Sequence, residues 1–143
     1  MKLTPEYIVG LVDGEGSFTI HVRDPKSFKK VIRRVKVEPR FYLKLIEKDK
    51  EILYELKSYF KCGNVYYQPD KRPNHQNCYR YEVVSRANLI DVIIPFFNKN
   101  KLRLKSKQTD FALFKRMMKL IMKKAHFTDF GLKNLYELKQ QMH

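Results

Sequence analysis

Cysteine, tryptophan and long apolar runs are scarce or missing in this chain. Its 143 residues include two cysteines, five glycines and no tryptophan. Cys62 and Cys78 form no CxxC pair and lack the spacing to histidine that zinc sites require, so we expect two reduced thiols, one in a loop and one in a strand. No stretch reaches the roughly 18 to 20 apolar residues of a membrane span, and the N-terminus lacks a signal-peptide pattern. We therefore expect an intracellular protein with no membrane partner.

Acidic residues are also few, because 15 Asp and Glu face 30 Lys and Arg, which leaves a net charge of +15. A surplus of this size repels itself in the folded state and is usually kept because the partner is anionic. Nucleic acid is the leading class of anionic partner, and a membrane surface ranks behind it and is not the expected partner. The 43% of hydrophobic residues argues against disorder, and the length suits one domain over residues 1–143.

The spacing of apolar residues predicts an α+β fold. A first helix begins at Thr4 and Pro5, which suit a cap and a first helical position, and it runs over residues 5–13. The order αββαββα, with further helices at the C-terminus, predicts helices packed on one face of a four-stranded antiparallel sheet. The expected strands lie within residues 17–23, 31–48, 65–69 and 78–85, and the other expected helices cover 49–60, 87–97, 104–125 and a segment after Thr128.

The other face of the predicted sheet is rich in cations. A charged strand face is often no more than solvated. Here several strands carry Lys, Arg and His with tyrosines between them, a mixture that can contact both phosphates and base edges. We interpret this face as a surface for double-stranded DNA, lying along the major groove. Its expected members are Thr19, His21, Arg23, Arg34, Lys36, Arg40, Tyr42, Lys44, Tyr66, Gln68 and Arg80.

The segment IVGLVDGEG, residues 8–16, carries three of the five glycines and two acidic residues. It resembles the signature motif of the LAGLIDADG homing endonucleases. The segments FKCGNVYY (60–67), IIPFFNKNKLRLKSKQTDF (93–111) and HFTDFGLKNLYELKQQM (126–142) are similar to segments in the same places of family members that carry one motif. The resemblance therefore covers nearly the whole chain.

The resemblance implies a homodimer. Gly10 and Gly14 are four residues apart on one helical face, so two such helices can pack with their backbones close together. This chain has one copy of the motif, and family members with one copy work as homodimers. The helix over residues 5–13 is then expected to pack against its two-fold mate.

The resemblance also implies a metal site at the end of the motif. The last acidic position of the motif, here Glu15, binds the divalent metal in the family, and the Gly14 carbonyl is expected as a further ligand. Mg²⁺ is the expected cofactor, with Mn²⁺ as a substitute, whereas Ca²⁺ should support binding but little cleavage. We expect Asp13 to accept hydrogen bonds from nearby backbone amides and to shape the turn.

Two further catalytic positions follow from the resemblance. Lys105 matches a position where a basic residue lies near the cleaved phosphate, and Lys107 and Gln108 are its alternatives. Glu47 falls where relatives place a polar residue that organises water, and Lys44 is its rival.

The expected activity is site-specific cleavage of both strands of a long, nearly palindromic DNA site by metal-dependent hydrolysis. One alternative is a cleavage-inactive DNA-binding protein or intron-splicing maturase of the same fold, with intron RNA as a partner. A basic RNA-binding protein is another. The target sequence stays open, as does the compartment, whether an organelle, an archaeal cytoplasm or another setting.

Overall fold

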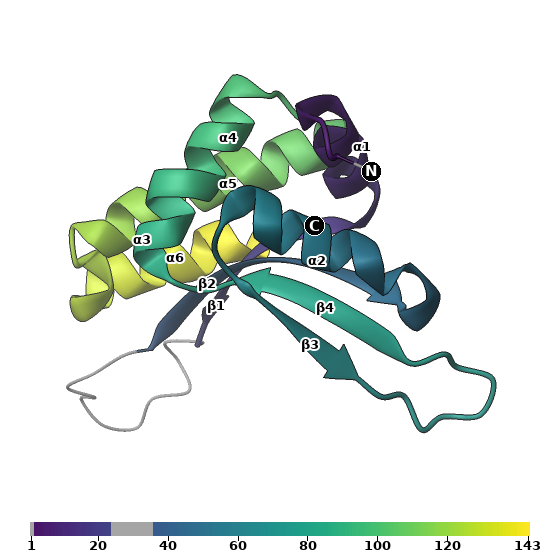
Figure 1. The fold of residues 1–143 in the computed structure, drawn as a ribbon. Helices are drawn as coiled ribbons and strands as arrows, with labels where there is room; N and C mark the ends of the chain where they lie inside the picture. The colour runs from purple at the N-terminus through teal and green to yellow at the C-terminus, as the bar shows by residue number, and fades with distance from the viewer. Residues whose placement is uncertain (1, 24–35) are drawn as a thin grey trace. The chain divides into compact units, whose positions relative to one another are not determined.

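The computed structural model describes residues 2–23 and 36–143 (Figure 1). The described residues form two compact units: unit 1 contains residues 2–17 and 40–104, and unit 2 contains 18–23, 36–39 and 105–143. The sheet has four strands in the order β1-β2-β4-β3, which confirms the α+β class and the antiparallel sheet. That the two units make one domain stays a prediction. The strands are β1 (Gly16–Val22), β2 (Val37–Ile46), β3 (Asn64–Gln68) and β4 (Cys78–Val83).

Helix α1 (Pro5–Glu15) begins where the sequence predicts and runs two residues further than expected. The Thr4 hydroxyl accepts a hydrogen bond from the Tyr7 amide at 3.2 Å and so caps the first turn. After Glu15 the chain becomes strand β1 without a connecting loop. Glycine is required at position 16, because a Cβ there would lie 2.6 Å from Val12 Cγ1. The last glycine of the motif therefore lets the chain leave the helix close to Val12.

In unit 1, helices cover one face of strands β2, β4 and β3. Helix α2 (Lys50–Phe60) packs against β3 and β4 (Figure 1) and buries Leu53 and Leu56 completely. Each such side chain stabilises the fold by about 1.5–3 kcal/mol. From α4 (Ile94–Lys99), Phe97 packs on Phe41 of β2 with ring centroids 5.7 Å apart. The short 3-10 helix η2 (Glu47–Asp49) joins β2 to α2.

The helix expected over residues 87–97 is composite. It consists of α3 (Arg86–Asn88), a π-helical turn η3 (Leu89–Ile93) and α4. Pro95 stands in the first turn of α4. Proline lacks an N–H and its ring clashes with the carbonyl four residues earlier, here that of Asp91, and a wider turn relieves this clash.

Helix α2 ends in the FKCGN segment, as expected. Lys61 adopts the left-handed conformation directly after the helix, with φ 57°. Gly63 follows with φ 85°, and a Cβ there would lie 2.7 Å from Tyr81 Cε1, so only glycine fits. The buried Tyr81 donates its hydroxyl to the Cys62 carbonyl at 2.7 Å. Cys62 in this loop and Cys78 at the start of β4 are free thiols, as predicted.

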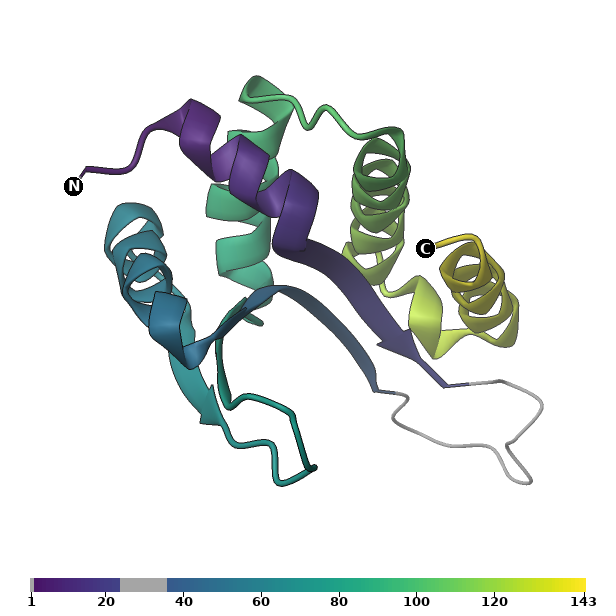
Figure 2. The same ribbon diagram turned by 90° about the vertical axis from the view of Figure 1, so that its right-hand side faces the viewer.

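In unit 2, strand β1 packs against the C-terminal helices. Phe18 contacts Phe111 and Phe114, with ring centroids 5.1 and 5.5 Å apart. Helix α5 (Lys105–Met122) buries the apolar stripe formed by Phe111, Phe114, Met118 and Ile121. Helix α6 (Asp129–Gln140) lies beside α5 (Figure 2). The short helix η4 (Ala125–Phe127) lies between them in the chain, and the Thr128 hydroxyl caps α6. In the described part of the chain, no helix combines the length and apolarity needed to cross a membrane.

Candidate functional site

Helix α1 leaves its glycine face uncovered in unit 1. Ile8 and Val12 are completely buried, whereas Gly10 and Gly14 are exposed. A Cβ at either glycine would meet no described atom within 4 Å. Tyr7, one turn before Gly10, is 43% exposed. The helix thus has a second apolar side that another helix can approach closely.

The C-terminal end of α1 presents oxygen ligands. Glu15 and Gly14 are exposed, and among the described residues no hydrogen bond or ion pair of the Glu15 side chain is found. The last carbonyl groups of a helix lack intrahelical partners and carry partial negative charge, and the last turn of α1 has no basic residue. This donor set suits a hard cation such as Mg²⁺. Residues 2–23 and 36–143 contain no group of three or more His, Cys, Asp or Glu side chains that could hold a metal. Of the two acidic residues of the motif, Glu15 is exposed, whereas Asp13 is buried.

Asp13 binds backbone amides, but not the nearby ones that we expected. Its buried carboxylate accepts the Arg103 amide on both oxygens at 3.1 Å and the Leu104 amide on Oδ1 at 3.2 Å. The expectation was wrong about the location, because the chain of unit 1 returns to the end of α1 some 90 residues later. Asp13 therefore fixes the segment whose next residue is Lys105.

The catalytic roles expected for Glu47, Lys44 and Lys105 stay predictions. Glu47 is exposed at the start of η2, and its amide donates to the Asn77 carbonyl at 3.0 Å. Lys44 is exposed on β2. Lys105 is the exposed first residue of α5 and belongs to unit 2, as do its alternatives Lys107 and Gln108, whereas Glu15 and Glu47 belong to unit 1.

The open face of the unit 1 strands gathers six of the predicted DNA-binding residues. Across the sheet, Lys44 lies opposite Arg80, and Arg80 lies opposite Tyr66. The Arg80 guanidinium lies 3.7 Å from the centre of the Tyr42 ring. Cations and aromatic rings lie together here, a combination that can contact the phosphates and bases of nucleic acid. The members of this unit 1 face are Arg40, Tyr42, Lys44, Tyr66, Gln68 and Arg80.

Glu82 is a member of the same face that the sequence reading missed. Its Oε2 lies 3.7 Å from Arg40 Nη1 and 3.4 Å from Arg80 Nε, so one carboxylate lies within ion-pair distance of both arginines. Glu82 lies opposite Tyr42 in the register of β2 and β4. Gln68 Oε1 is buried with no hydrogen-bond partner among the described residues, and it is an acceptor that a ligand could use.

The remaining predicted DNA-binding residues belong to unit 2 or to undescribed residues. Thr19 and His21 lie on the polar side of β1, and Thr19 accepts a hydrogen bond from Lys139 Nζ at 2.6 Å. Lys139, from α6, is therefore a cation beside β1 that sequence reasoning missed. Arg23 and Lys36 are exposed next to the strand ends. Arg34 lies outside the described residues.

Known proteins resemble the chain in sequence. The LAGLIDADG endonuclease family matches residues 8–118. The chain is 32% identical over 135 residues to "Probable intron-encoded endonuclease 2" of Neurospora crassa. This alignment covers 94% of this chain and 28% of that protein. It is 26% identical over 112 residues to "Homing endonuclease I-ApeII" of Aeropyrum pernix, covering 78% and 60%. The chain spans 25% to 31% of the length of three curated relatives that it matches.

Solved structures resemble the chain in fold. The homing endonuclease I-TnaI superposes with a TM-score of 0.81 at 32% identity, over 100% of this chain and 90% of that one. The I-SmaMI LAGLIDADG homing endonuclease bound to cleaved DNA superposes with a TM-score of 0.82 at 31% identity, over 99% of this chain and 44% of that one. The fold is thus that of the homing endonucleases. The chain belongs to the LAGLIDADG endonuclease family.

Proposed function

We propose that this protein is a site-specific homing endonuclease that cleaves both strands of a long, nearly palindromic DNA site by metal-dependent hydrolysis. The end of α1 carries the proposal, because the exposed Glu15 carboxylate there lacks a partner in the described chain and follows a glycine face that is open. A relative supports the choice of substrate, since I-SmaMI has been crystallised with an uncleaved DNA target and calcium, and with cleaved DNA.

The active form is a homodimer in this proposal. Gly10 and Gly14 leave room for a second α1 at close approach, and each chain offers one Glu15 carboxylate. Two chains together offer two such carboxylates, one for each strand to be cut. The match to 44% of I-SmaMI supports this arrangement, because one copy of this chain matches less than half of that protein.

The roles of the residues follow from their chemistry. Glu15 and the Gly14 carbonyl would hold Mg²⁺, which supplies stabilisation of the charge that develops on the reacting oxygens. By the family resemblance, Lys105 would act as a cation that stabilises charge on the cleaved phosphate. The unit 1 face would bind and orient the DNA through Arg40, Lys44 and its other members.

The cleavage-inactive alternative is less well supported. A protein that only binds DNA has no need for an exposed carboxylate at the end of α1, since this charge repels phosphate. The open Glu15 side chain therefore favours catalysis over binding alone.

A randomised library of DNA duplexes tests this function. Bound duplexes are recovered with Ca²⁺ present and cut duplexes with Mg²⁺ present, with EDTA as the control for cleavage. We expect one nearly palindromic site to be enriched in both pools, with both strands cut in Mg²⁺ and neither in EDTA. Enrichment by binding without cutting in Mg²⁺ or Mn²⁺ would contradict the enzyme. Absence of any enriched site would contradict sequence-specific DNA binding as well.

A further inference from the structure

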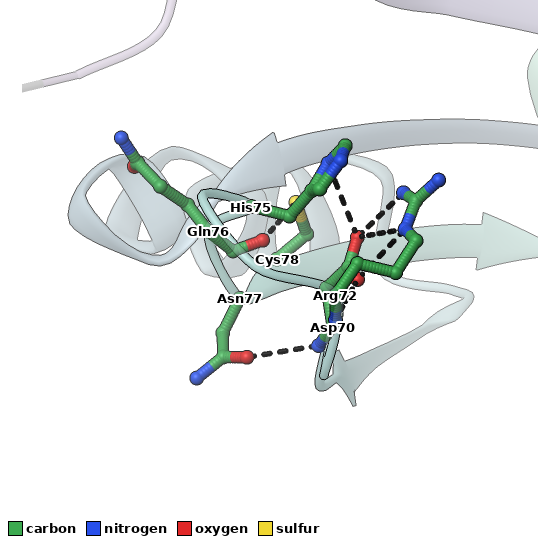
Figure 3. Close-up of polar contacts among 6 residues, drawn as sticks. All are labelled: Asp70, Arg72, His75, Gln76, Asn77 and Cys78. Carbon is green, nitrogen blue, oxygen red and sulfur yellow. Dashed lines mark hydrogen bonds and ion pairs between the residues drawn. The ribbon is translucent and has the colours of Figure 1, made fainter.

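The loop between β3 and β4, residues 69–77, takes its conformation from its own polar contacts (Figure 3). The Asn77 Oδ1 atom accepts the Asp70 amide at 2.8 Å and so joins the two ends of the loop. Asp70 Oδ1 accepts the Arg72 amide at 3.0 Å, and the His75 amide donates to the Arg72 carbonyl at 3.3 Å. Asn74 reverses the chain with φ 62°, a conformation that asparagine tolerates. The loop is thus shaped before any partner binds.

The Asp70 carboxylate holds one edge of the Arg72 guanidinium (Figure 3). Arg72 Nε donates to Oδ1 at 3.0 Å and to Oδ2 at 3.3 Å, and Nη2 donates to Oδ2 at 2.6 Å. The Nη1 nitrogen takes no part in these bonds. The Arg72 side chain is 68% exposed, whereas that of Asp70 is 18% exposed. A second edge of the guanidinium, formed by Nη1 and the outer N–H of Nη2, is therefore available for a ligand.

We propose that Arg72 reads a guanine in the major groove of the DNA site and that Asp70 is its positioning residue. This inference rests on the DNA binding in the proposed function. A guanidinium presents two parallel N–H donors along each edge, and guanine offers O6 and N7 as paired acceptors in the major groove. An arginine that is already held in place loses less conformational freedom when it binds.

The charge of Asp70 favours a base over a phosphate as the ligand. The carboxylate and the guanidinium together carry no net charge, so a phosphate gains little from the pair and is repelled by the nearby Asp70 oxygens. A guanine edge is neutral and depends on the direction of the donors, which Asp70 fixes. Arg72 holds the pKa of the Asp70 carboxyl well below its usual range, so the carboxylate stays charged at neutral pH. His75 Nδ1 also lies 3.7 Å from Asp70 Oδ2.

The loop continues the unit 1 face. Gln68, a member of that face, is the last residue of β3 and stands two positions before Asp70. The loop lies beyond the last residue of β3 and the first residue of β4 (Figure 1). Within unit 1, DNA that contacts Tyr66 and Gln68 would meet the loop next along the strands.

The test measures binding on a panel of duplexes in Ca²⁺, each derived from the site selected by binding, with every base pair changed in turn. The wild-type protein should lose about 5- to 150-fold in affinity when one G·C pair per half-site is changed. Arg72→Ala should bind all bases equally at that pair and keep its discrimination elsewhere. Asp70→Asn should weaken discrimination at the same pair without weakening overall affinity, because it removes a negative charge near DNA. Lys71→Ala is the matched control from the same loop and should keep the discrimination.

A phosphate contact would give a different result. Arg72→Ala would then weaken binding equally on every duplex and lower the magnitude of the salt slope by about one unit. That outcome, or full discrimination by Arg72→Ala, would overturn the assignment while DNA binding stands. If the wild type binds its site without cutting it, only the enzymatic proposal fails and the panel still decides on Arg72. If no duplex is selected by binding, both proposals are overturned.

Discussion

Replacing Asp13 with alanine should destabilise the end of α1 strongly. The buried carboxylate accepts the Arg103 amide at 3.1 Å and the Leu104 amide at 3.2 Å. Hydrogen bonds to a charged group contribute about 1.5–3 kcal/mol each, and an unsatisfied buried amide costs about 1–3 kcal/mol. Because water can reach part of the exposed 103–104 segment, we expect the free energy of unfolding to fall by about 3 kcal/mol. For a chain of this size the melting temperature should fall by about 6–12 °C.

Urea unfolding followed by circular dichroism measures this loss. Asp13→Asn should lose about half as much, ~1.5 kcal/mol, because Oδ1 accepts both amides while the new amide nitrogen faces the Arg103 amide. Glu6→Gln, on the exposed first turn of the same helix, is the control and should change stability by less than about 0.5 kcal/mol. A wild-type unfolding midpoint for Asp13→Ala would refute the assignment of Asp13 as the anchor of the 103–104 segment.

Three further predictions concern assembly, DNA binding and the core. Gly10→Leu should leave the fold intact but favour the monomer in sedimentation, because the added side chain points into open space where the partner helix would pack; an undisturbed dimer would contradict this. Lys44→Ala should lower the magnitude of the salt slope of DNA binding by about one unit, whereas the control Lys57→Ala on α2 should leave the slope unchanged. If the two variants have the same slope, the unit 1 face does not bind the DNA. Tyr81→Phe should lose about 1 kcal/mol with the hydroxyl bond to the Cys62 carbonyl. Burial raises the pKa of Tyr81 above its unfolded value of about 10, so this advantage over Tyr81→Phe is present below pH 10 and should shrink above it in urea unfolding; a constant difference would contradict it.

The elements of the fold were predictable where the signal is local. Apolar residues such as Phe18 and Ile20 alternate with polar residues and so predict a strand, and the Thr4 cap predicts the start of α1. Both signals act within a few residues. The π-helical turn before Pro95 was not predicted, since the apolar spacing of residues 87–97 also fits an ordinary helix. The proline itself carried a signal that a bend was needed.

The site was predictable in part, and the limit was long-range contact. The glycine face of α1 is open and Glu15 is exposed, whereas the dimer contact and the metal-binding role that the motif implies stay predictions. The partners of Asp13 could not be predicted, because they depend on how a segment 90 residues away returns to the helix. Glu82 was missed for a similar reason, since its place between Arg40 and Arg80 depends on the register of two strands.

The Glu15→Gln variant tests the central claim most directly. The substitution keeps the size of the side chain but removes the charge that would hold the metal, so the variant should fold, dimerise and bind the selected duplex as the wild type does. Glu6→Gln makes the same change at the other end of α1 and should cut normally. The measurement is single-turnover cleavage of the selected duplex in Mg²⁺ at saturating protein, with binding measured separately on the same DNA. The account predicts that Glu15→Gln loses at least about 100-fold in rate with its affinity unchanged, and cleavage at the wild-type rate would contradict it.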